Sequence, residues 1–293
     1  MTETLPNFFI VGAAKSGTTS LYHYLGQHPQ VFMSPVKEPN FFSHGMSRRC
    51  PGAPDEVVIS DCGEYRDLFA GVQNECAIGE ASTSYLPNPD AALRIRERVP
   101  GARIIAMLRD PIERAYTQFE MHRRLGMEKC SEFLEAVTAE QRDLGWDGYY
   151  LTPGRYARQL ERYFEVFPAN HILIHLYDDL RADPSAVVRR TFGFLDVDDG
   201  FEPDTARRYN VGGEIRRPRL QAFLDDLPRP IRSGLGTLVP QATRTRIYWK
   251  LREWNLRTKG APVEVRQRLL PLVHDDILAV QELTGRDLSA WLV

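Results

Sequence analysis

A glycine-containing loop near the start of the sequence has the composition of an anion-binding site. Gly12-Ala13-Ala14-Lys15-Ser16-Gly17-Thr18-Thr19 lies between an apolar run and a helical pattern. In that setting, backbone N–H groups and the first turn of a helix can bind phosphate. Lys15 would add a mobile positive charge, and Gly17 would let the backbone approach the anion closely. The predicted anion-binding residues are Lys15, Ser16, Gly17, Thr18 and Thr19.

The same loop departs from the Walker A motif of magnesium-ATP enzymes. That motif has its lysine directly after the second glycine, whereas Lys15 precedes Gly17 by two positions. A convincing Walker B aspartate after an apolar strand is also missing from the sequence. A P-loop kinase that uses magnesium ATP is therefore the less favoured alternative, and an ordinary strand-to-helix turn with a surface lysine is another.

An arginine and a threonine form a second candidate site. Arg109 follows the apolar run Arg103–Leu108, and a helical pattern begins directly after it at Asp110-Pro111. Open parallel sheets bind ligands at the carboxyl ends of their strands, which is where Arg109 would lie. Thr117 lies eight positions later, about two helical turns away. A guanidinium suits a terminal phosphate well, although Arg109 could instead pair with Asp110 or cap a loop.

A carboxylate in a rigid setting forms the third candidate site. The segment Lys37-Glu38-Pro39-Asn40-Phe41-Phe42 follows a second apolar run. A positioned carboxylate can accept the proton that an attacking alcohol loses. A glutamate beside a lysine is ordinarily a surface pair of little energetic value. Here the fixed Pro39 and the two phenylalanines favour a partly buried, rigid site.

The composition is that of a globular protein with a large core. The chain has 293 residues, of which 43% are hydrophobic and 26% are charged, and its formal net charge of −2 disfavours nucleic-acid binding. The four cysteines (Cys50, Cys62, Cys76 and Cys130) lack metal-site spacing and are expected to be free thiols. The N-terminus has no signal-peptide pattern, and no apolar stretch approaches membrane-spanning length. We expect a cytoplasmic protein without a transmembrane segment.

Short apolar runs alternate with helical patterns along the chain. The expected strands are Phe8–Val11, Val31–Met33, Cys76–Gly79, Arg103–Leu108 and Ile172–Leu176. The expected helices are Thr18–Leu25, Asp110–Leu125, Ser131–Arg142, Pro153–Phe167 and Pro184–Leu195. This alternation predicts an α/β fold, a single P-loop-like domain with a central parallel sheet flanked by helices and a helical C-terminal portion.

Together the three segments resemble the sulfotransferases that use 3′-phosphoadenosine 5′-phosphosulfate (PAPS). The glycine loop is similar to their 5′-phosphosulfate loop, and Arg109 with Thr117 is similar to their 3′-phosphate-binding motif. The segment Lys37–Phe42 resembles the branch that contains the heparan sulfate O- and N-sulfotransferases, in which the matching glutamate is the general base. The chain looks like a bacterial-type soluble member of this branch. The resemblance implies that Glu38, Lys15 and Lys37 of this chain are catalytic.

Two further segments carry weaker likenesses. Gly79–Leu86 resembles a family segment but has Ala81 where many members carry a lysine, and Thr83 where they have proline. Residues 154–160 and 172–180 are similar to the later part of the family core, so the resemblance covers about residues 7–195. The expected organisation is one domain over residues 1–293, with a nucleotide-binding core over 7–195 and a cofactor-closing, substrate-side helical region over 196–293.

The loop Gly212–Pro218 lies where relatives close over the nucleotide. Arg216 or Arg217 would contact the 3′-phosphate, although the loop departs from the family pattern and could be an ordinary surface turn. Phe41, His44 and Tyr85 are candidate acceptor-site residues, and core packing explains the two aromatic ones equally well.

The resemblance implies in-line transfer of a sulfuryl group from PAPS to a hydroxyl or amine of a small molecule, lipid or carbohydrate. Adenosine 3′,5′-bisphosphate would be the product, and no metal would be needed. A catalytically silent nucleotide-binding protein is a second alternative beside the kinase, and Ala81 is the feature in its favour. The sequence names neither the acceptor nor the oligomeric state.

Overall fold

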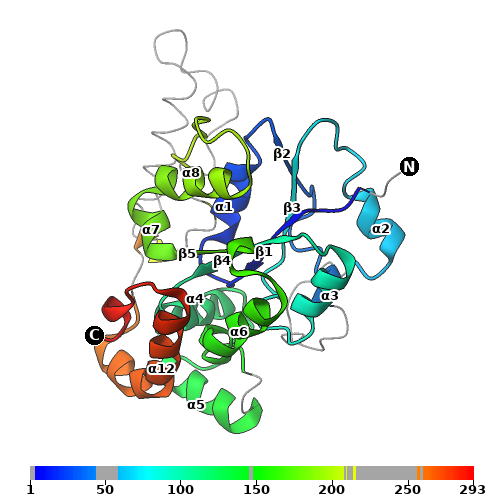
Figure 1. The fold of residues 1–293 in the computed structure, drawn as a ribbon. Helices are drawn as coiled ribbons and strands as arrows, with labels where there is room; N and C mark the ends of the chain where they lie inside the picture. Colours follow the sequence, from blue (N-terminus) through cyan, green and yellow to red (C-terminus); the bar gives the residue numbers. More distant parts are fainter. Residues whose placement is uncertain are drawn as a thin grey trace, which may run out of the picture.

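Five parallel strands form the central sheet (Figure 1). The computed structural model describes residues 4–43, 59–144, 148–207, 209, 214–215, 256–257 and 260–293. The strands are β1 (Phe8–Gly12), β2 (Val31–Met33), β3 (Ala77–Ala81), β4 (Arg103–Leu108) and β5 (Ile172–Leu176), in the sheet order β2-β3-β1-β4-β5. The five expected strands and the α/β fold are therefore confirmed.

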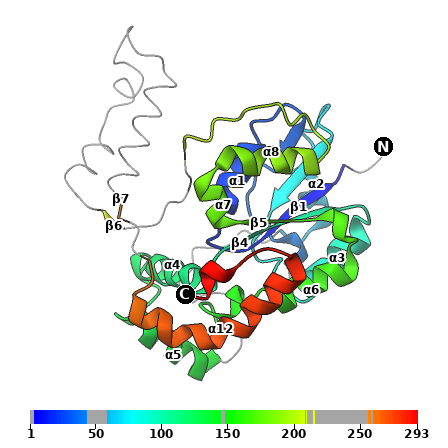
Figure 2. The same ribbon diagram turned by 60° about the vertical axis from the view of Figure 1, so that its left-hand side comes forward.

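Helices cover both faces of this sheet (Figures 1 and 2). One face carries α1 (Thr18–Leu25), α7 (Tyr177–Ala182) and α8 (Pro184–Phe194). The other face carries α3 (Ala91–Arg98), α4 (Pro111–Arg124), α6 (Ala157–Val166) and α12 (Val263–Thr284), with α2 (Cys62–Asp67) and α5 (Phe133–Leu144) toward the outside. Strands buried on both faces need apolar residues at every position, which is why they stand out as continuous apolar runs.

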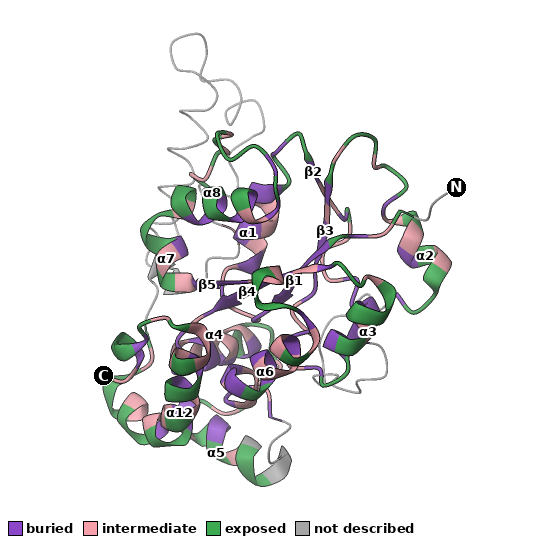
Figure 3. Cartoon of the chain, viewed as in Figure 1, coloured by how far each residue is buried: buried purple, intermediate pink, exposed green. Residues whose placement is uncertain are grey.

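The core lies in two layers, one on each side of the sheet. In β1, Phe8 and Ile10 pack toward α1 and α8, while Phe9 and Val11 pack toward α3 and α6. Figure 3 shows the strands and the inward helix faces as buried and the outer helix faces as exposed. This packing fixes the strands, so that the loops at their carboxyl ends start from a rigid base.

Helix α6 begins later than the sequence pattern indicates. The helix expected from Pro153 is a short 3₁₀ turn over Thr152–Gly154, followed by α6 from Ala157. The carboxylate of Asp276 on α12 accepts hydrogen bonds from the backbone N–H groups of Tyr156 and Ala157, at 2.8 and 3.2 Å. It therefore caps α6 from a distant part of the chain.

The C-terminal region contains one long helix and one short strand pair in the ranges that the structure describes. Helix α12 packs against α4 and α6. Strands β6 (Glu214–Ile215) and β7 (Leu256–Arg257) pair antiparallel. Residues 177–180, directly after β5, begin helix α7.

Candidate active site at the carboxyl edge of the sheet

The three predicted segments meet at neighbouring strand ends. Strand β1 lies between β3 and β4, so the glycine loop after β1 is next to the segments that follow both strands. The backbone N–H of Ala13 donates to the carbonyl of Met107 at 2.7 Å, and that of Glu38 donates to the carbonyl of Ala81 at 2.9 Å. The Arg109 guanidinium donates to the Lys15 carbonyl at 3.1 Å. The fold thus brings together the loop, the arginine and the candidate base.

The glycine loop depends on the lack of a side chain at residue 17. Gly17 has φ 89° directly before α1, a conformation that favours glycine. A Cβ atom there would lie 2.8 Å from Leu180 and 3.1 Å from Tyr177, both on α7. The N-cap residue of α1 is Gly17, which has no side chain to cap the helix, and the start of a helix favours bound anions. Ser16 is fully buried, and its backbone N–H donates to the carbonyl of Ala13 at 3.3 Å.

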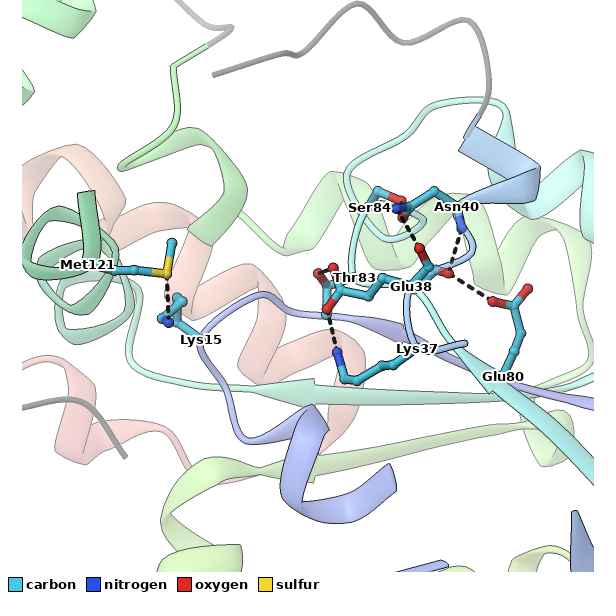
Figure 4. A network of polar contacts seen from close by, with 9 residues as sticks. Lys15, Lys37, Glu38, Asn40, Glu80, Thr83, Ser84 and Met121 are labelled. Atoms are coloured by element: carbon cyan, nitrogen blue, oxygen red, sulfur yellow. Dashed lines mark hydrogen bonds and ion pairs between the residues drawn. The ribbon is translucent and has the colours of Figure 1, made fainter. Parts of the chain in front are cut away.

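Lys15 points toward helix α4 rather than toward the candidate base (Figure 4). Its Nζ atom lies 3.2 Å from Sδ of Met121, and a thioether is only a weak acceptor. Burial lowers the pKa of Lys15 to about 8, and the positive charges of Arg124, Arg109 and Arg114 act in the same direction. An anion bound among these cations would relieve their mutual repulsion.

Arg109, directly before α4, makes two weaker contacts besides its hydrogen bond to the Lys15 carbonyl. Its guanidinium lies over the ring of Tyr177, 4.6 Å from the centroid, and 3.8 Å from the Glu113 carboxylate. The alternative pairing with Asp110 is not observed. Asp110 instead caps α4 through the N–H groups of Ile112 and Glu113, and its carboxylate lies 2.7 Å from Arg266.

Thr117 lies farther along α4, as its spacing from Arg109 predicted. Its Oγ1 donates to the carbonyl of Glu113 at 2.8 Å. The hydroxyl oxygen keeps acceptor capacity, while its proton is used within the helix.

Glu38 lies in a polar turn after β2. Its carboxylate forms an ion pair with Lys37 and accepts a hydrogen bond from Thr83 Oγ1 at 3.4 Å. Both side chains of the ion pair are part-buried, as the flanking proline and phenylalanines indicated. Thr83 is one of the two departures from the family pattern, and here it supplies a donor that proline could not.

A buried carboxylate, Glu80, lies beneath this turn. It is fully buried in β3 and accepts hydrogen bonds from Tyr65 at 2.6 Å, Tyr85 at 2.8 Å and Ser82 at 2.8 Å. Burial raises the pKa of Glu80 to about 7, and the three hydroxyl donors oppose this rise. We did not predict a role for Glu80 from the sequence, although a glutamate inside an otherwise apolar strand is a usable indication of one.

The candidate acceptor residues fall into two groups. Phe41 is buried and stacks on Tyr65 with 4.1 Å between ring centroids, and Tyr85 is fully buried with its hydroxyl on Glu80. Core packing therefore accounts for the positions of both. His44 lies outside the described residues. So do Arg216 and Arg217.

Neither a metal-binding cluster nor a membrane-spanning helix occurs in the described parts of the chain. No group of three His, Cys, Asp or Glu residues there could hold a metal ion. No helix there combines the length and the apolar composition needed to cross a bilayer. A surface cleft of about 370 Å³ is lined by Phe41, Phe42, Arg94, Glu97 and Arg98. It shares no residue with the glycine loop, but Phe41 and Phe42 belong to the segment that carries Glu38.

Comparison with known proteins identifies similar sequences and folds. The family model for the sulfotransferase domain matches residues 5–208. Human bifunctional heparan sulfate N-deacetylase/N-sulfotransferase 3 is 31% identical over 209 residues, a match that spans 67% of this chain but only 23% of that protein. A crystal structure of a sulfotransferase from Alicyclobacillus acidocaldarius is 30% identical, with a TM-score of 0.73 over 98% of this chain and 99% of that one. A mouse sulfotransferase complexed with PAP is 11% identical, with a TM-score of 0.52 over 96% of this chain and 89% of that one, and it shares the fold.

Proposed function

The chain belongs to the sulfotransferase family, and we propose that it transfers a sulfuryl group from PAPS to a hydroxyl or amine of a carbohydrate, lipid or other small-molecule acceptor. The observation that carries this proposal is that Lys15, Arg109 and Glu38 follow strands β1, β4 and β2 at one edge of the sheet, with Arg109 bonded to the loop and Glu38 to the end of β3. The relative named above acts on heparan sulfate according to its name, which supports a carbohydrate acceptor. The mouse structure with PAP supports the nucleotide.

The residues of the glycine loop and of α4 fit a nucleotide that carries phosphate groups at both the 5′ and the 3′ positions of its ribose. The first turn of α1 and the ammonium of Lys15 would hold the 5′-phosphosulfate, because N–H donors and a positive charge converge there. Arg109 would hold the 3′-phosphate with its guanidinium, which can exchange its present contacts for a phosphate. Thr117 would join it by turning its hydroxyl proton from the Glu113 carbonyl to a phosphate oxygen. Bound PAPS supplies a sulfuryl group activated by its attachment to phosphate.

Two side chains would act during transfer. Glu38 would accept the proton of the acceptor hydroxyl or amine as the acceptor attacks sulfur. Lys15 would stabilise the charge that develops on the departing 5′-phosphate, as fixed donors do in related transfers. Lys37 pairs with Glu38 and would supply the positive charge that Ala81 does not.

The alternatives are less favoured. A magnesium-ATP kinase would need its lysine after the second glycine, and the matching family model is a sulfotransferase domain. A catalytically silent nucleotide-binding protein would not need a base such as Glu38 at the same edge of the sheet as the glycine loop. For the place of action we keep the cytoplasm as a prediction, supported by the free thiols of Cys62, Cys76 and Cys130.

Calorimetric titration tests the donor. We expect adenosine 3′,5′-bisphosphate to bind without metal, and magnesium ATP to bind at least tenfold more weakly because it lacks the 3′-phosphate. Binding of magnesium ATP with no binding of the bisphosphate would replace the sulfotransferase proposal with a kinase. Once the nucleotide is established, a screen of carbohydrate, lipid and small-molecule acceptors with radiolabelled PAPS identifies the acceptor class.

A further inference from the structure

The turn that carries Glu38 has an unusual backbone. Glu38 and Asn40 have φ values of 61° and 57°, on either side of Pro39. The left-handed region is unfavourable for residues with a side chain, although asparagine tolerates it better than most. Two such residues within three positions persist only where surrounding contacts hold them. The contacts that hold this turn converge on Asn40.

Asn40 uses both ends of its side chain and its own backbone N–H. Its Nδ2 donates to the carbonyl of Glu38 at 2.8 Å, and its Oδ1 accepts from Ser84 at 2.6 Å. Its backbone N–H donates to Oγ of Ser82 at 3.1 Å. Only 3% of Asn40 is exposed, so water does not compete for these bonds. The amide therefore links the backbone of Glu38 directly to the segment that follows β3.

The segment that follows β3 is itself held by hydrogen bonds to the buried carboxylate of Glu80 (Figure 4). Ser82 Oγ donates to Glu80 Oε2 at 2.8 Å, which directs its lone pairs toward other donors such as the Asn40 N–H. Ser82 and Glu80 are both fully buried, and Glu80 is also held by two tyrosine hydroxyls. Asn40 thus connects Glu38 to the sheet through an unbroken series of short hydrogen bonds.

We infer that Asn40 is a positioning residue for Glu38. It fixes the turn around Pro39 so that the Glu38 carboxylate faces an acceptor at the glycine loop. This inference rests on the proposed role of Glu38 as the base. Asparagine suits the position because it tolerates a positive φ while offering a donor and an acceptor together. Glycine would keep the backbone conformation without the amide, and aspartate would keep the acceptor without the donor.

The test compares Asn40→Gly and Asn40→Asp with Glu38→Gln and a matched control. Asn88→Gly is the control, because Asn88 is equally buried and also accepts hydrogen bonds through its side chain, at the start of α3. Sulfuryl transfer from radiolabelled PAPS is measured with N-desulfated heparin as the probe acceptor. Amide hydrogen exchange at Glu38, whose N–H donates to Ala81, is followed in the same variants.

We expect Asn40→Gly and Asn40→Asp to lower kcat by about tenfold or more, with KM for PAPS within about twofold, because misplacing a catalytic group costs rate rather than donor binding. Exchange at the Glu38 amide should become about tenfold faster in Asn40→Gly. Asn88→Gly should change neither kcat nor this exchange rate.

Two results would overturn the positioning role of Asn40. One is unchanged exchange at Glu38 in Asn40→Gly, a readout that needs no acceptor. The other is an unchanged kcat in Asn40→Gly while Glu38→Gln loses turnover. An unchanged kcat in Glu38→Gln would instead overturn the base assignment, and the inference about Asn40 with it.

Discussion

Two regions at the same edge of the sheet are held by different kinds of contact. They are the glycine loop (residues 12–19) with Arg109, called the loop region, and the turn that carries Glu38 (residues 37–42), called the base turn. In the loop region the charged groups have few strong partners: Lys15 contacts a thioether, and Arg109 lies over an aromatic ring and donates one hydrogen bond, to the Lys15 carbonyl. In the base turn, Glu38 lies in a network of short hydrogen bonds that extends to the buried carboxylate of Glu80. Figure 4 shows the two groups of side chains at separate places above the sheet.

The difference matches what each region would do in the proposed reaction. A nucleotide brings its own negative charge, so cations held by weak contacts can turn to it at little cost. A base must already lie in the correct position when the acceptor arrives, because it gains no strong partner on binding. The comparison therefore predicts that changes in the loop affect donor binding and leaving-group stabilisation, whereas changes in the base turn affect turnover or stability.

Removal of the base should have the largest effect. Glu38→Gln is expected to lower kcat by about 10²–10⁴, the usual contribution of general-base catalysis, and to leave the affinity for adenosine 3′,5′-bisphosphate within about twofold. Turnover is measured with radiolabelled PAPS and N-desulfated heparin, and affinity by calorimetry. A loss of affinity comparable to the loss of turnover would mean that the two regions are not separate.

Lys15→Ala should have the next largest effect, and in the other region. Loss of one charge-stabilising donor costs about 10²–10³ in kcat, on the order of 2–4 kcal/mol of transition-state stabilisation. The affinity for the bisphosphate should also fall, because the same ammonium would contact the 5′-phosphate. Steady-state kinetics and calorimetry on one preparation separate the two effects. A kcat within threefold of the wild type would remove Lys15 from the mechanism.

Glu80→Gln tests, through the pH dependence of the free energy of unfolding, the buried carboxylate to which the base turn is bonded. The pKa of Glu80 is about 7 in the folded protein and 4.5 ordinarily, so the folded state binds more protons between these values. The free energy of unfolding should therefore fall as the pH rises from about 4.5 to about 7, by about 3 kcal/mol from this group.

The Glu80→Gln variant should lack this part of the fall. Urea unfolding at pH 5, 6, 7 and 8 measures it in both proteins. Asp276, whose pKa is raised to about 6, contributes to both proteins and cancels in the difference. Identical pH profiles would show that Glu80 is ionised throughout this range.

Arg109→Ala sharpens the description of the loop region. A charge-assisted hydrogen bond to the 3′-phosphate is worth about 1.5–3 kcal/mol, so affinity for adenosine 3′,5′-bisphosphate should fall by about 10- to 100-fold. Affinity for adenosine 5′-phosphate, which lacks that phosphate, should change less than about threefold. Calorimetry with both nucleotides is the measurement, and equal weakening would show that Arg109 does not recognise the 3′-phosphate.

The sequence was sufficient for the parts of the molecule that local pattern determines. Strands such as Arg103–Leu108 are continuous apolar runs bounded by turn residues, because both faces of a parallel sheet are buried. Gly17, Arg109 and Glu38 could be singled out as candidates because each belongs to a short motif at a strand end. Their meeting at one edge follows from the parallel topology itself.

Other features depend on contacts between distant segments. The start of α6 is set by Asp276, 120 positions beyond Tyr156. The ring of Tyr177 contacts Arg109 only because β5 lies beside β4, and no motif pairs the two residues. Asn40 sits at a motif position without an assigned role, and its importance appears only with Ser82 and Ser84 in place.

The smallest expected effect is that of Met121→Leu. This variant tests whether Lys15 leaves its contact with Met121 when a nucleotide binds. Leucine conserves the volume of the side chain but removes the sulfur that accepts from Lys15. If this contact only occupies Lys15 until a nucleotide arrives, the affinity for the bisphosphate should rise slightly or stay within about twofold, since a neutral thioether is a weak acceptor. Calorimetry measures this, with Met107→Leu, a fully buried methionine of the core, as the control for packing. A tenfold loss specific to Met121→Leu would mean that the loop is prearranged like the base turn, and the contrast between the two regions would fail.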